Sequence, residues 1–574
     1  MQQAATGRIE EAIASLRLQL RLKPVDLEAM SVLGALLVQS GQMAQAITVL
    51  ERCVAAFPRH AMAHNNLANA YMQAGRLRES ARHYERALEL HPDHMQALLG
   101  LSFCRTSLEE SEAAIAAAER GLAIQPDLTE MHINHGLALA AADRLDDALA
   151  SMRRVLARRP QDADLRSQFL LALNYLSLPA EEIAREHRDV RLGVRGTPEP
   201  PDTGREPDRP LRVGVLSGDL REHSVGYFAD APLARMPEGW KLVVFSLHSG
   251  GKRDPMLERY EALADEWVKV APLDAASIDA EIRRRRIDVL LELGGHTGGG
   301  RLQALDRKPA PVVVSAIGYP NTTGHPSVDL RFVDSVTDPA GSDALCTERL
   351  VRLDPCFLCY RPLDGAPEPA MPAADAPITF GSFNLTSKIR EATIALWSRV
   401  LADVPGSRLL LKAKSLKDGG MRKRLLARFE AGGIDPARVE TIAFTDTVQE
   451  HLALYSRIHV ALDSTPYNGT TTTCEALWMG VPVVCVRGDR HSARVGASLL
   501  NAAGCAELLA EDADGFVRIA TGLAGDRERL ARLRSGLRDR LRGSPLLDAD
   551  AYAARFHAAL RQAWRDHCGT GATR

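Results

Sequence analysis

Four consecutive threonines, residues 470–473, form the segment of the sequence with the most definite chemistry. They follow a predicted strand that ends near Asp463 and a turn of small and polar residues, and a helix is predicted to begin near Thr471. Threonine is a poor choice inside a helix because it is β-branched. At a helix N-terminus, however, its hydroxyl and the free backbone N–H groups converge, and a diphosphate fits such an anion site. A single N-cap needs only one threonine, so the run favours phosphate binding over a plain cap.

Three more side chains in this half of the chain have types and positions that suit a nucleotide. Glu475, one turn into the threonine helix, could accept hydrogen bonds from ribose hydroxyls, or it could be an ordinary acid favoured by the helix dipole. Lys388 lies at the start of another predicted helix, where a cation is explained if it faces a phosphate; the alternative is a solvated surface lysine. His451 begins a helix after a strand, where an imidazole could stack on a nucleobase or be a plain polar residue.

The preceding half of the chain offers a histidine and two glycine-bearing loops. His223 follows the first predicted strand in LSGDLREHSVGYF, and GGHTGGG (294–300) and GYPNTTG (318–324) follow two later strands. Glycine lets the backbone approach a ligand closely. A lone histidine is more often structural than catalytic, but a loop at the carboxyl end of a strand makes either role plausible for His223.

These loops require strands to position them, and short β-branched runs supply the candidates. Helical stretches alternate with the runs, which is typical of parallel strands with crossover helices. Two Rossmann-like halves with a linker between them create a cleft, and ligands in such sheets lie at the carboxyl ends of strands. Terminal helices at about 512–566 are expected to cross back over a domain. The predicted strands are 211–217, 242–247, 287–293 and 310–318 in the first half, and 378–383, 408–413, 439–444, 459–463 and 482–486 in the second.

The N-terminal part of the chain carries a regular repeat, marked by prolines at 24, 58, 92, 126 and 160. A period of about 34 residues is typical of the tetratricopeptide repeat, whose stacked helix pairs form a superhelix with a concave groove. We expect the groove to bind protein or peptide; the alternative is that the array only packs against the rest of the chain. Asn65, Asn66 and Asn134 could grip a peptide backbone there or lie on the outer face. The repeats are predicted at 27–60, 61–94, 95–128 and 129–162.

Residues 1–26 supply only the second helix of an earlier repeat, and an unpaired helix leaves an apolar face uncovered. Either the natural start lies upstream or this face pairs with another chain, as in a homodimer. The chain is thus predicted to be multidomain, an all-α repeat superhelix followed by two Rossmann-like α/β domains. The expected parts are repeats with capping helices at 1–195, a proline-rich linker at 196–210, the first α/β domain at 211–361, a second linker at 362–377 and the second α/β domain at 378–574.

Composition excludes several classes of protein. The chain has 574 residues, 45% of them hydrophobic and 25% charged, which is ordinary for a globular protein. A net charge of −2 gives no bulk attraction to nucleic acid or anionic lipid, and no apolar run approaches the ~20 residues of a membrane span. Nine cysteines, an odd number, fit reduced thiols in the cytoplasm. Cys356 and Cys359 form a single CxxC pair, too few ligands for a zinc site, so no metal is expected.

The order of these motifs resembles a known family. Tetratricopeptide repeats, a linker, and then SGDLREH, GGHTGGG, IGYPNTTG, GSFNLTSK, QEHLALY and PYNGTTTTCEALWMGVPVV are together similar to the O-linked N-acetylglucosamine transferase family, in particular a bacterial member. The resemblance covers nearly the whole chain. It implies the glycosyltransferase B architecture and an inverting, metal-independent enzyme without a cofactor. Such an enzyme moves N-acetylglucosamine from UDP to Ser or Thr hydroxyls of proteins.

The resemblance also implies roles for individual residues. His223 matches the active-site histidine proposed as general base, Lys388 the lysine on the donor diphosphate, and His451 the histidine that stacks on uracil. Whether His223 or an oxygen of the donor phosphate takes the acceptor proton stays open. The other implied UDP-sugar contacts are the phosphate-binding Thr470, Thr471 and Thr472, the ribose-binding Glu475, Asn384 of GSFNLTSK, and Thr297, Gly318 and Pro320 in loops that border the sugar.

The chain also departs from the family pattern. Leu385 stands where the animal enzymes have a donor-contacting glutamine, Leu454 replaces an arginine, and Thr470 replaces a histidine. Loss of a charge-assisted contact could lower donor affinity about tenfold or more. Two alternatives therefore stay open: the same fold with another donor such as UDP-glucose, and a non-catalytic repeat scaffold with a degenerate nucleotide domain.

Overall fold

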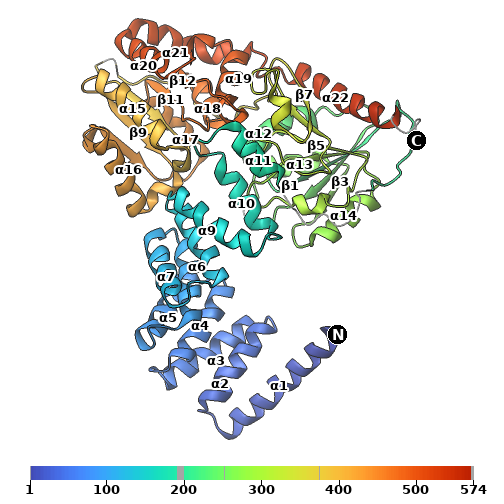
Figure 1. Cartoon of the computed structure of the whole chain (residues 1–574), viewed down its shortest axis with the longest axis vertical. Helices are drawn as coiled ribbons and strands as arrows, with labels where there is room; N and C mark the ends of the chain where they lie inside the picture. The colour runs from blue at the N-terminus through green and yellow to red at the C-terminus, as the bar shows by residue number, and fades with distance from the viewer. Residues whose placement is uncertain (1, 190–198, 251–252, 374, 570–574) are drawn as a thin grey trace. The chain divides into compact units, whose positions relative to one another are not determined.

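The structure is a computed structural model that describes residues 2–189, 199–250, 253–373 and 375–569 (Figure 1). The chain forms two compact units, one of Met1–Arg159 with Lys417–Lys423, and one of Pro160–Leu416 with Arg424–Arg574. No helix within the described residues combines the length and the apolar character that a membrane crossing needs.

The first unit consists of paired helices with a strict period. The first helices of the pairs begin at 27, 61, 95 and 129, which are the predicted repeat starts, so the repeat is confirmed. The helices are α1 (Gln2–Leu22), α2 (Leu27–Gln39), α3 (Met43–Ala56), α4 (Ala61–Gln73), α5 (Leu77–Leu90), α6 (Met95–Ser107), α7 (Ser111–Ile124), α8 (Thr129–Ala141) and α9 (Leu145–Arg158).

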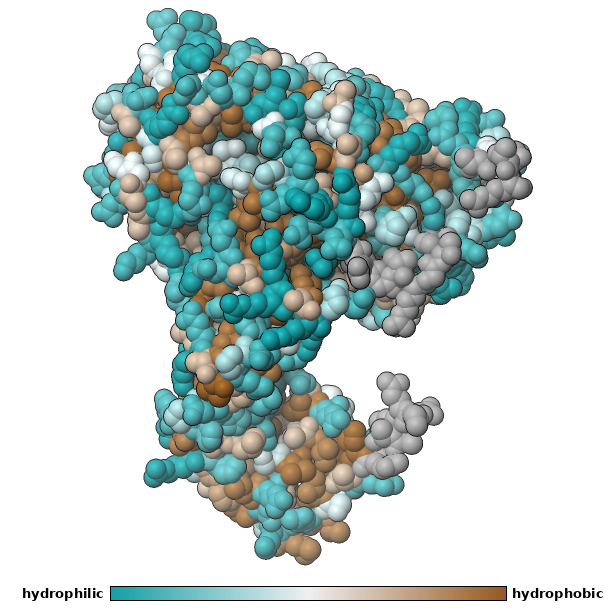
Figure 2. Space-filling model, in the orientation of Figure 1, coloured by the Kyte–Doolittle hydropathy of each residue, from teal (hydrophilic) through white to brown (hydrophobic). Residues whose placement is uncertain are grey.

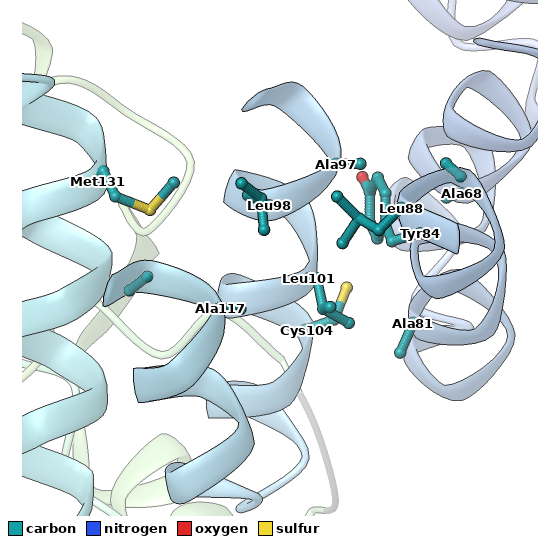
Figure 3. Packing of buried hydrophobic residues seen from close by; sticks show 12 residues of the cluster. Ala68, Ala81, Tyr84, Leu88, Ala97, Leu98, Leu101, Cys104, Ala117 and Met131 are labelled. Atoms are coloured by element: carbon teal, nitrogen blue, oxygen red, sulfur yellow. The ribbon is translucent and has the colours of Figure 1, made fainter. Parts of the chain in front are cut away.

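Small residues let neighbouring helices approach closely. A Cβ at Gly100 of α6 would lie 2.1 Å from the ring of Tyr84 of α5, so only glycine fits there. Tyr84 is fully buried in a cluster with Ala68, Leu98 and Met131, drawn from several helices of the stack (Figure 3). Each repeat therefore buries its apolar face against its neighbours, as expected for a solenoid.

The three asparagines that are candidates for peptide binding in the groove are buried or hydrogen-bonded within the repeat unit. Asn65 is buried. Asn66 Nδ2 donates to Ser31 Oγ at 2.9 Å, and Asn134 Nδ2 donates to the Leu99 carbonyl oxygen at 3.0 Å. Asn66 and Asn134 thus connect first helices of successive pairs, α4 to α2 and α8 to α6, and a role in gripping peptide stays a prediction.

Hydrophobic side chains are exposed at the end of the repeat unit that α1 and α2 form (Figure 2). Leu18 and Leu22 of α1 are 60% and 80% exposed, and Val25 is 64% exposed. The inner face of α1 packs on α2 through Ile13, which is buried. Pairing of the outer face with another chain stays a prediction.

The second unit begins with α10 (Ala163–Leu173) and α11 (Ala180–Arg188) and contains two parallel sheets. The first sheet has the order β3-β2-β1-β4-β5-β6-β7 and the second β10-β9-β8-β11-β12-β13, which is the predicted pair of Rossmann-like domains. The first sheet comprises β1 (Arg212–Ser217), β2 (Lys241–Ser246), β3 (Glu266–Lys269), β4 (Val289–Glu292), β5 (Val312–Ser315), β6 (Leu330–Val333) and β7 (Arg349–Arg352). The second comprises β8 (Thr379–Ser382), β9 (Arg408–Lys412), β10 (Val439–Ile442), β11 (Val460–Leu462), β12 (Val483–Val486) and β13 (Leu509–Ala510).

Helices that lie between and after these strands in the sequence complete the two lobes. In the first lobe they are α12 (Ser224–Leu233), α13 (Pro255–Leu263) and α14 (Ala275–Arg284). In the second they are α15 (Glu391–Asp403), α16 (Gly419–Ala431, of which the residues up to Lys423 belong to the first compact unit), α17 (Val448–Ala453), α18 (Thr471–Trp478), α19 (Val495–Ala502), α20 (Ala513–Gly525) and α21 (Arg527–Arg542), and the chain continues into α22 (Ala549–Gly569).

Two features bear on the expected domain limits, which stay a prediction. The compact units divide near residue 160, so α10 and α11 belong to the second unit, where His187 Nε2 lies 2.7 Å from the Tyr319 hydroxyl. In addition, α22 follows the second lobe in sequence but packs beside β5 and α12 of the first lobe (Figure 1). The expectation that the terminal helices cross back over a domain is therefore met by α22. Part of the first proline-rich linker, 196–198, lies outside the described residues.

Candidate active site

The carboxyl edge of the second sheet places the phosphate-binding candidates around one aspartate. Asp463 follows β11 and is buried, and its Oδ1 accepts hydrogen bonds from the backbone N–H groups of Gly469 at 2.7 Å and Ser464 at 2.8 Å. Burial raises the pKa of Asp463 to about 6, against the opposing effects of those N–H donors and of Lys388. The carboxylate therefore closes the turn that leads into α18.

Helix α18 begins at Thr471, as predicted, and Thr472 and Thr473 each form a side-chain hydrogen bond. Thr470 is the N-cap residue, and its side chain does not cap the helix. Thr472 Oγ1 donates to Asn384 Oδ1 at 3.0 Å, and Thr473 Oγ1 donates to the Gly469 carbonyl oxygen at 3.2 Å. The first-turn N–H groups of any α-helix lack intrahelical acceptors, so this start presents donors to an anion.

Lys388 lies beside this helix start. Its Nζ donates to the Asn468 carbonyl oxygen at 2.7 Å and lies 4.0 Å from the centroid of the Tyr467 ring. Burial lowers the pKa of Lys388 to about 8, while the nearby Asp463 carboxylate acts in the opposite direction. The geometry therefore brings a cation to the turn that precedes α18.

His451 and Glu475 form a hydrogen-bonded pair farther along the same edge. An ammonium group can only donate, so Lys412 Nζ donates to His451 Nδ1 at 2.6 Å, and the ring proton lies on Nε2. Nε2–H then donates to Glu475 Oε2 at 3.0 Å, and the hydroxyl of the buried Tyr455 donates to the same oxygen at 3.3 Å. The orientation of His451 is thus fixed from both ring nitrogens.

The first lobe contributes His223 and Ser224 opposite the threonine helix. Thr471 Oγ1 donates to Ser224 Oγ at 2.7 Å, so the start of α18 meets the start of α12. His223 is the N-cap of α12, and its Nδ1 accepts from the Val225 N–H at 3.3 Å. Burial lowers the pKa of His223, although the carboxylate of Asp219 opposes this effect. Because Nδ1 accepts a hydrogen bond, the neutral ring carries its proton on Nε2.

The predicted sugar-bordering residues lie in loops of the first lobe. Thr297 Oγ1 donates to the Gly294 carbonyl oxygen at 2.6 Å, and Pro320 is buried. A Cβ at Gly318 would lie 1.8 Å from the Leu293 carbonyl oxygen and 3.1 Å from a methyl group of Val225. Gly318 thus allows the loop after β5 to contact both the end of β4 and the start of α12, next to His223.

A cavity of about 510 Å³ opens at the carboxyl ends of β1 and β2 in the same lobe. Its walls come from the loops after β1, β2 and β4. The charged and polar residues that line it include Asp219, Arg221, Glu222, His248 and Asp254. The cavity adjoins the segment that carries His223.

The sequence patterns did not identify two residues of this region, Lys412 and Glu292, as candidates for the site. Lys412 ends β9, and a lysine directly after a run of leucines at a strand's carboxyl end was an available signal. Glu292 ends β4 as the single acid of an apolar strand, and its Oε1 accepts from the N–H groups of Gly294 and Gly295 at 2.7 Å each. Its Oε2 has no hydrogen-bond partner in the described part of the chain, and burial raises the pKa of Glu292 to about 7.

Comparisons with known proteins agree with this architecture. The model of glycosyl transferase family 41 matches residues 199–360 and 370–556, and tetratricopeptide repeat models match 37–82 and 65–129. An O-GlcNAc transferase structure from Thermobaculum terrenum has 34% sequence identity and a TM-score of 0.80, and the match covers 89% of this chain and 98% of that one.

Curated relatives match well over half of the chain. The probable UDP-N-acetylglucosamine–peptide N-acetylglucosaminyltransferase SPINDLY of Arabidopsis thaliana is 38% identical over 412 residues, which are 70% of this chain and 45% of that protein. The probable enzyme SEC of the same plant is 27% identical over 372 residues, 62% of this chain and 37% of that protein. The chain therefore spans less than half the length of these relatives.

Proposed function

Because the chain belongs to glycosyl transferase family 41, we propose that it transfers N-acetylglucosamine from UDP-GlcNAc to Ser or Thr hydroxyls of proteins. The reaction inverts the anomeric configuration and needs no metal ion. One arrangement carries the proposal: Lys388, the start of α18 and the His451–Glu475 pair share the carboxyl edge of the second sheet, and Thr471 contacts Ser224, the neighbour of His223.

The diphosphate of the donor occupies the start of α18. The N–H groups of its first turn and the ammonium of Lys388 stabilise negative charge as UDP leaves, and preorganised donors of this kind are usually a large part of catalysis. The nucleoside lies toward His451, which stacks on the base, and Glu475, which accepts from the ribose hydroxyls through the oxygen that His451 does not use.

The acceptor hydroxyl attacks the anomeric carbon as the bond to the UDP oxygen breaks, and its proton must go to a base. Nδ1 of His223 is occupied by the Val225 N–H and Nε2 carries a hydrogen, so in this arrangement the ring presents a donor. The geometry therefore favours a phosphate oxygen of the donor as the proton acceptor, with His223 orienting the reactants. The cavity lined by Asp219 and His248 is a place for acceptor residues beside the modified hydroxyl.

A donor panel tests the proposal. The full chain is incubated with Ser/Thr-containing peptides and UDP-GlcNAc, UDP-glucose or a GDP-linked sugar, with and without EDTA, and mass spectrometry measures the added mass. We expect an N-acetylhexosamine on Ser or Thr from UDP-GlcNAc alone, unaffected by EDTA and absent in Lys388→Ala. Transfer from a different donor would show that the proposed donor, UDP-GlcNAc, is wrong. Failure to bind UDP at millimolar concentration in calorimetry would support the scaffold alternative.

A further inference from the structure

The loop between α10 and α11, residues 174–178, is held by both catalytic lobes. The buried guanidinium of Arg490, from the second lobe, donates to the carbonyl oxygens of Asn174, Leu176 and Leu178. From the first lobe, Asn321 Nδ2 donates to Asn174 Oδ1 at 2.8 Å. The position of the loop is therefore fixed by hydrogen bonds from the two lobes together.

This loop brings one aromatic ring to the neighbourhood of the diphosphate site. The Tyr175 ring stacks on Tyr467, with centroids 5.0 Å apart and an interplanar angle of 22°. Tyr467 is the ring on which the Lys388 ammonium lies, at 4.0 Å. Burial raises the pKa of Tyr175, and the side chain of Ser387, the residue before Lys388, opposes this effect. Tyr175 thus contacts the ring that Lys388 itself contacts.

We propose that Tyr175 is a positioning residue that fixes Lys388 for the donor diphosphate by holding the Tyr467 ring. This inference rests on the proposed function, in which Lys388 binds the leaving diphosphate. Before the donor arrives, the ammonium contacts a carbonyl oxygen and the Tyr467 ring, so the place of that ring decides where the cation lies. Aromatic pairs favour particular stacked geometries, so the Tyr175 ring selects one position of its partner.

Removal of the Tyr175 ring has two expected consequences. Tyr467 loses its stacking partner, so Lys388 samples more positions and donor turnover falls by about tenfold. Water also reaches the ammonium, which weakens the burial that now lowers its pKa, so the lysine stays charged to higher pH. The charged group facing it is the Asp463 carboxylate, which the substitution leaves in place.

Three variants separate positioning from general stability. Tyr175→Ala removes the ring, and Tyr175→Phe keeps the ring but removes the hydroxyl. Trp240→Ala removes a half-buried aromatic at the amino end of β2, the opposite edge of the first sheet. The kcat and KM for the donor are measured from pH 6.5 to 10, with the melting temperature of each variant.

We expect Tyr175→Ala to lower kcat/KM about tenfold at pH 7.5 and to move its alkaline decline to higher pH. Tyr175→Phe should keep both within about threefold of the unaltered chain, and Trp240→Ala should lower the melting temperature without moving the decline. An unchanged pH profile in Tyr175→Ala, or an equal defect in Tyr175→Phe, would overturn the proposal. If no donor is turned over, the proposed function fails, and the pH dependence of UDP affinity in calorimetry decides the role of Tyr175 in the same variants.

Discussion

Lys388 shows how a single residue can be placed for chemistry that its surroundings oppose. Its ordinary pKa is 10.5, but burial lowers it to about 8 because the charged form loses water. The free protein therefore loses this cation as the pH rises through 8. A bound diphosphate favours the charged form and raises the pKa again. We expect kcat/KM for the donor to fall above pH 8, and kcat at saturating donor to fall only at higher pH.

Substitution tests the same residue without a change of pH. Lys388→Ala should lower kcat/KM by about 100-fold or more, as for the loss of a charged contact to a developing anion. The control is Lys241→Ala, whose ammonium forms an exposed ion pair with Asp265 at the far edge of the first sheet. Exposed pairs contribute little, so that variant should keep full activity. Near-normal turnover of Lys388→Ala would remove the lysine from the mechanism.

Glu292 is a second residue whose surroundings oppose its charge, and it should make stability depend on pH. Its pKa is about 7 in the folded protein, against an ordinary value of 4.5. Between these values the folded state keeps a proton that the unfolded state has released, so stability falls as the pH rises and the loss is complete above 7. Glu292→Gln cannot ionise. Relative to the unaltered chain, it should gain about 1–3 kcal/mol between pH 5 and pH 8.5.

Urea unfolding at the two pH values measures this difference. Glu238, an exposed acid of the same lobe, supplies the control, since Glu238→Gln should change stability equally at both pH values. An equal effect of Glu292→Gln at pH 5 and pH 8.5 would show that the carboxyl does not change its charge in this range.

At the scale of elements, local patterns predicted most strands but not the pairings between side chains. Apolar β-branched runs identified β1 and β4. The prediction missed β3 (EWVK), β6 (LRFV) and β7 (RLVR), in which charged residues flank or interrupt the few apolar positions, and β13, which has only two residues. The threonine helix was predictable since its strand, turn and first turn are contiguous. By contrast, the contact of Lys412 with His451 and the stacking of Tyr175 on Tyr467 depend on long-range packing, which no local pattern encodes.

The turn before α18 depends on Gly469. A Cβ there would lie 2.5 Å from Thr472 Oγ1 and 3.0 Å from Asn384 Oδ1, so Gly469→Ala must displace the hydrogen bond that joins these residues. We expect UDP affinity in calorimetry to fall by about tenfold. Gly522→Ala is the matched control, because a Cβ at Gly522 of α20 meets nothing within 4 Å. Unchanged UDP affinity of Gly469→Ala would show that the start of α18 is not the nucleotide site.

At the scale of the whole molecule, the end of the chain stabilises a lobe whose sheet was completed far earlier in the sequence, since β7 ends at Arg352 and α22 begins at Ala549. The hydroxyl of Tyr552 donates to the Phe357 carbonyl oxygen at 2.7 Å, and the buried Phe556 ring meets Phe332 of β6 edge-on at 5.0 Å. The first lobe therefore cannot reach its final stability until α22 has been added.

Phe556→Ala tests this dependence. Loss of a buried phenylalanine should lower the free energy of unfolding by about 3–5 kcal/mol. In hydrogen exchange, β6 and α12 should lose protection before β8 and β11 do, because the cavity opens on the first lobe. Gln562→Ala, an exposed position of the same helix, should change stability by less than about 0.5 kcal/mol. If protection from exchange fell first in the second lobe, α22 would stabilise that lobe instead, and the prediction would be wrong.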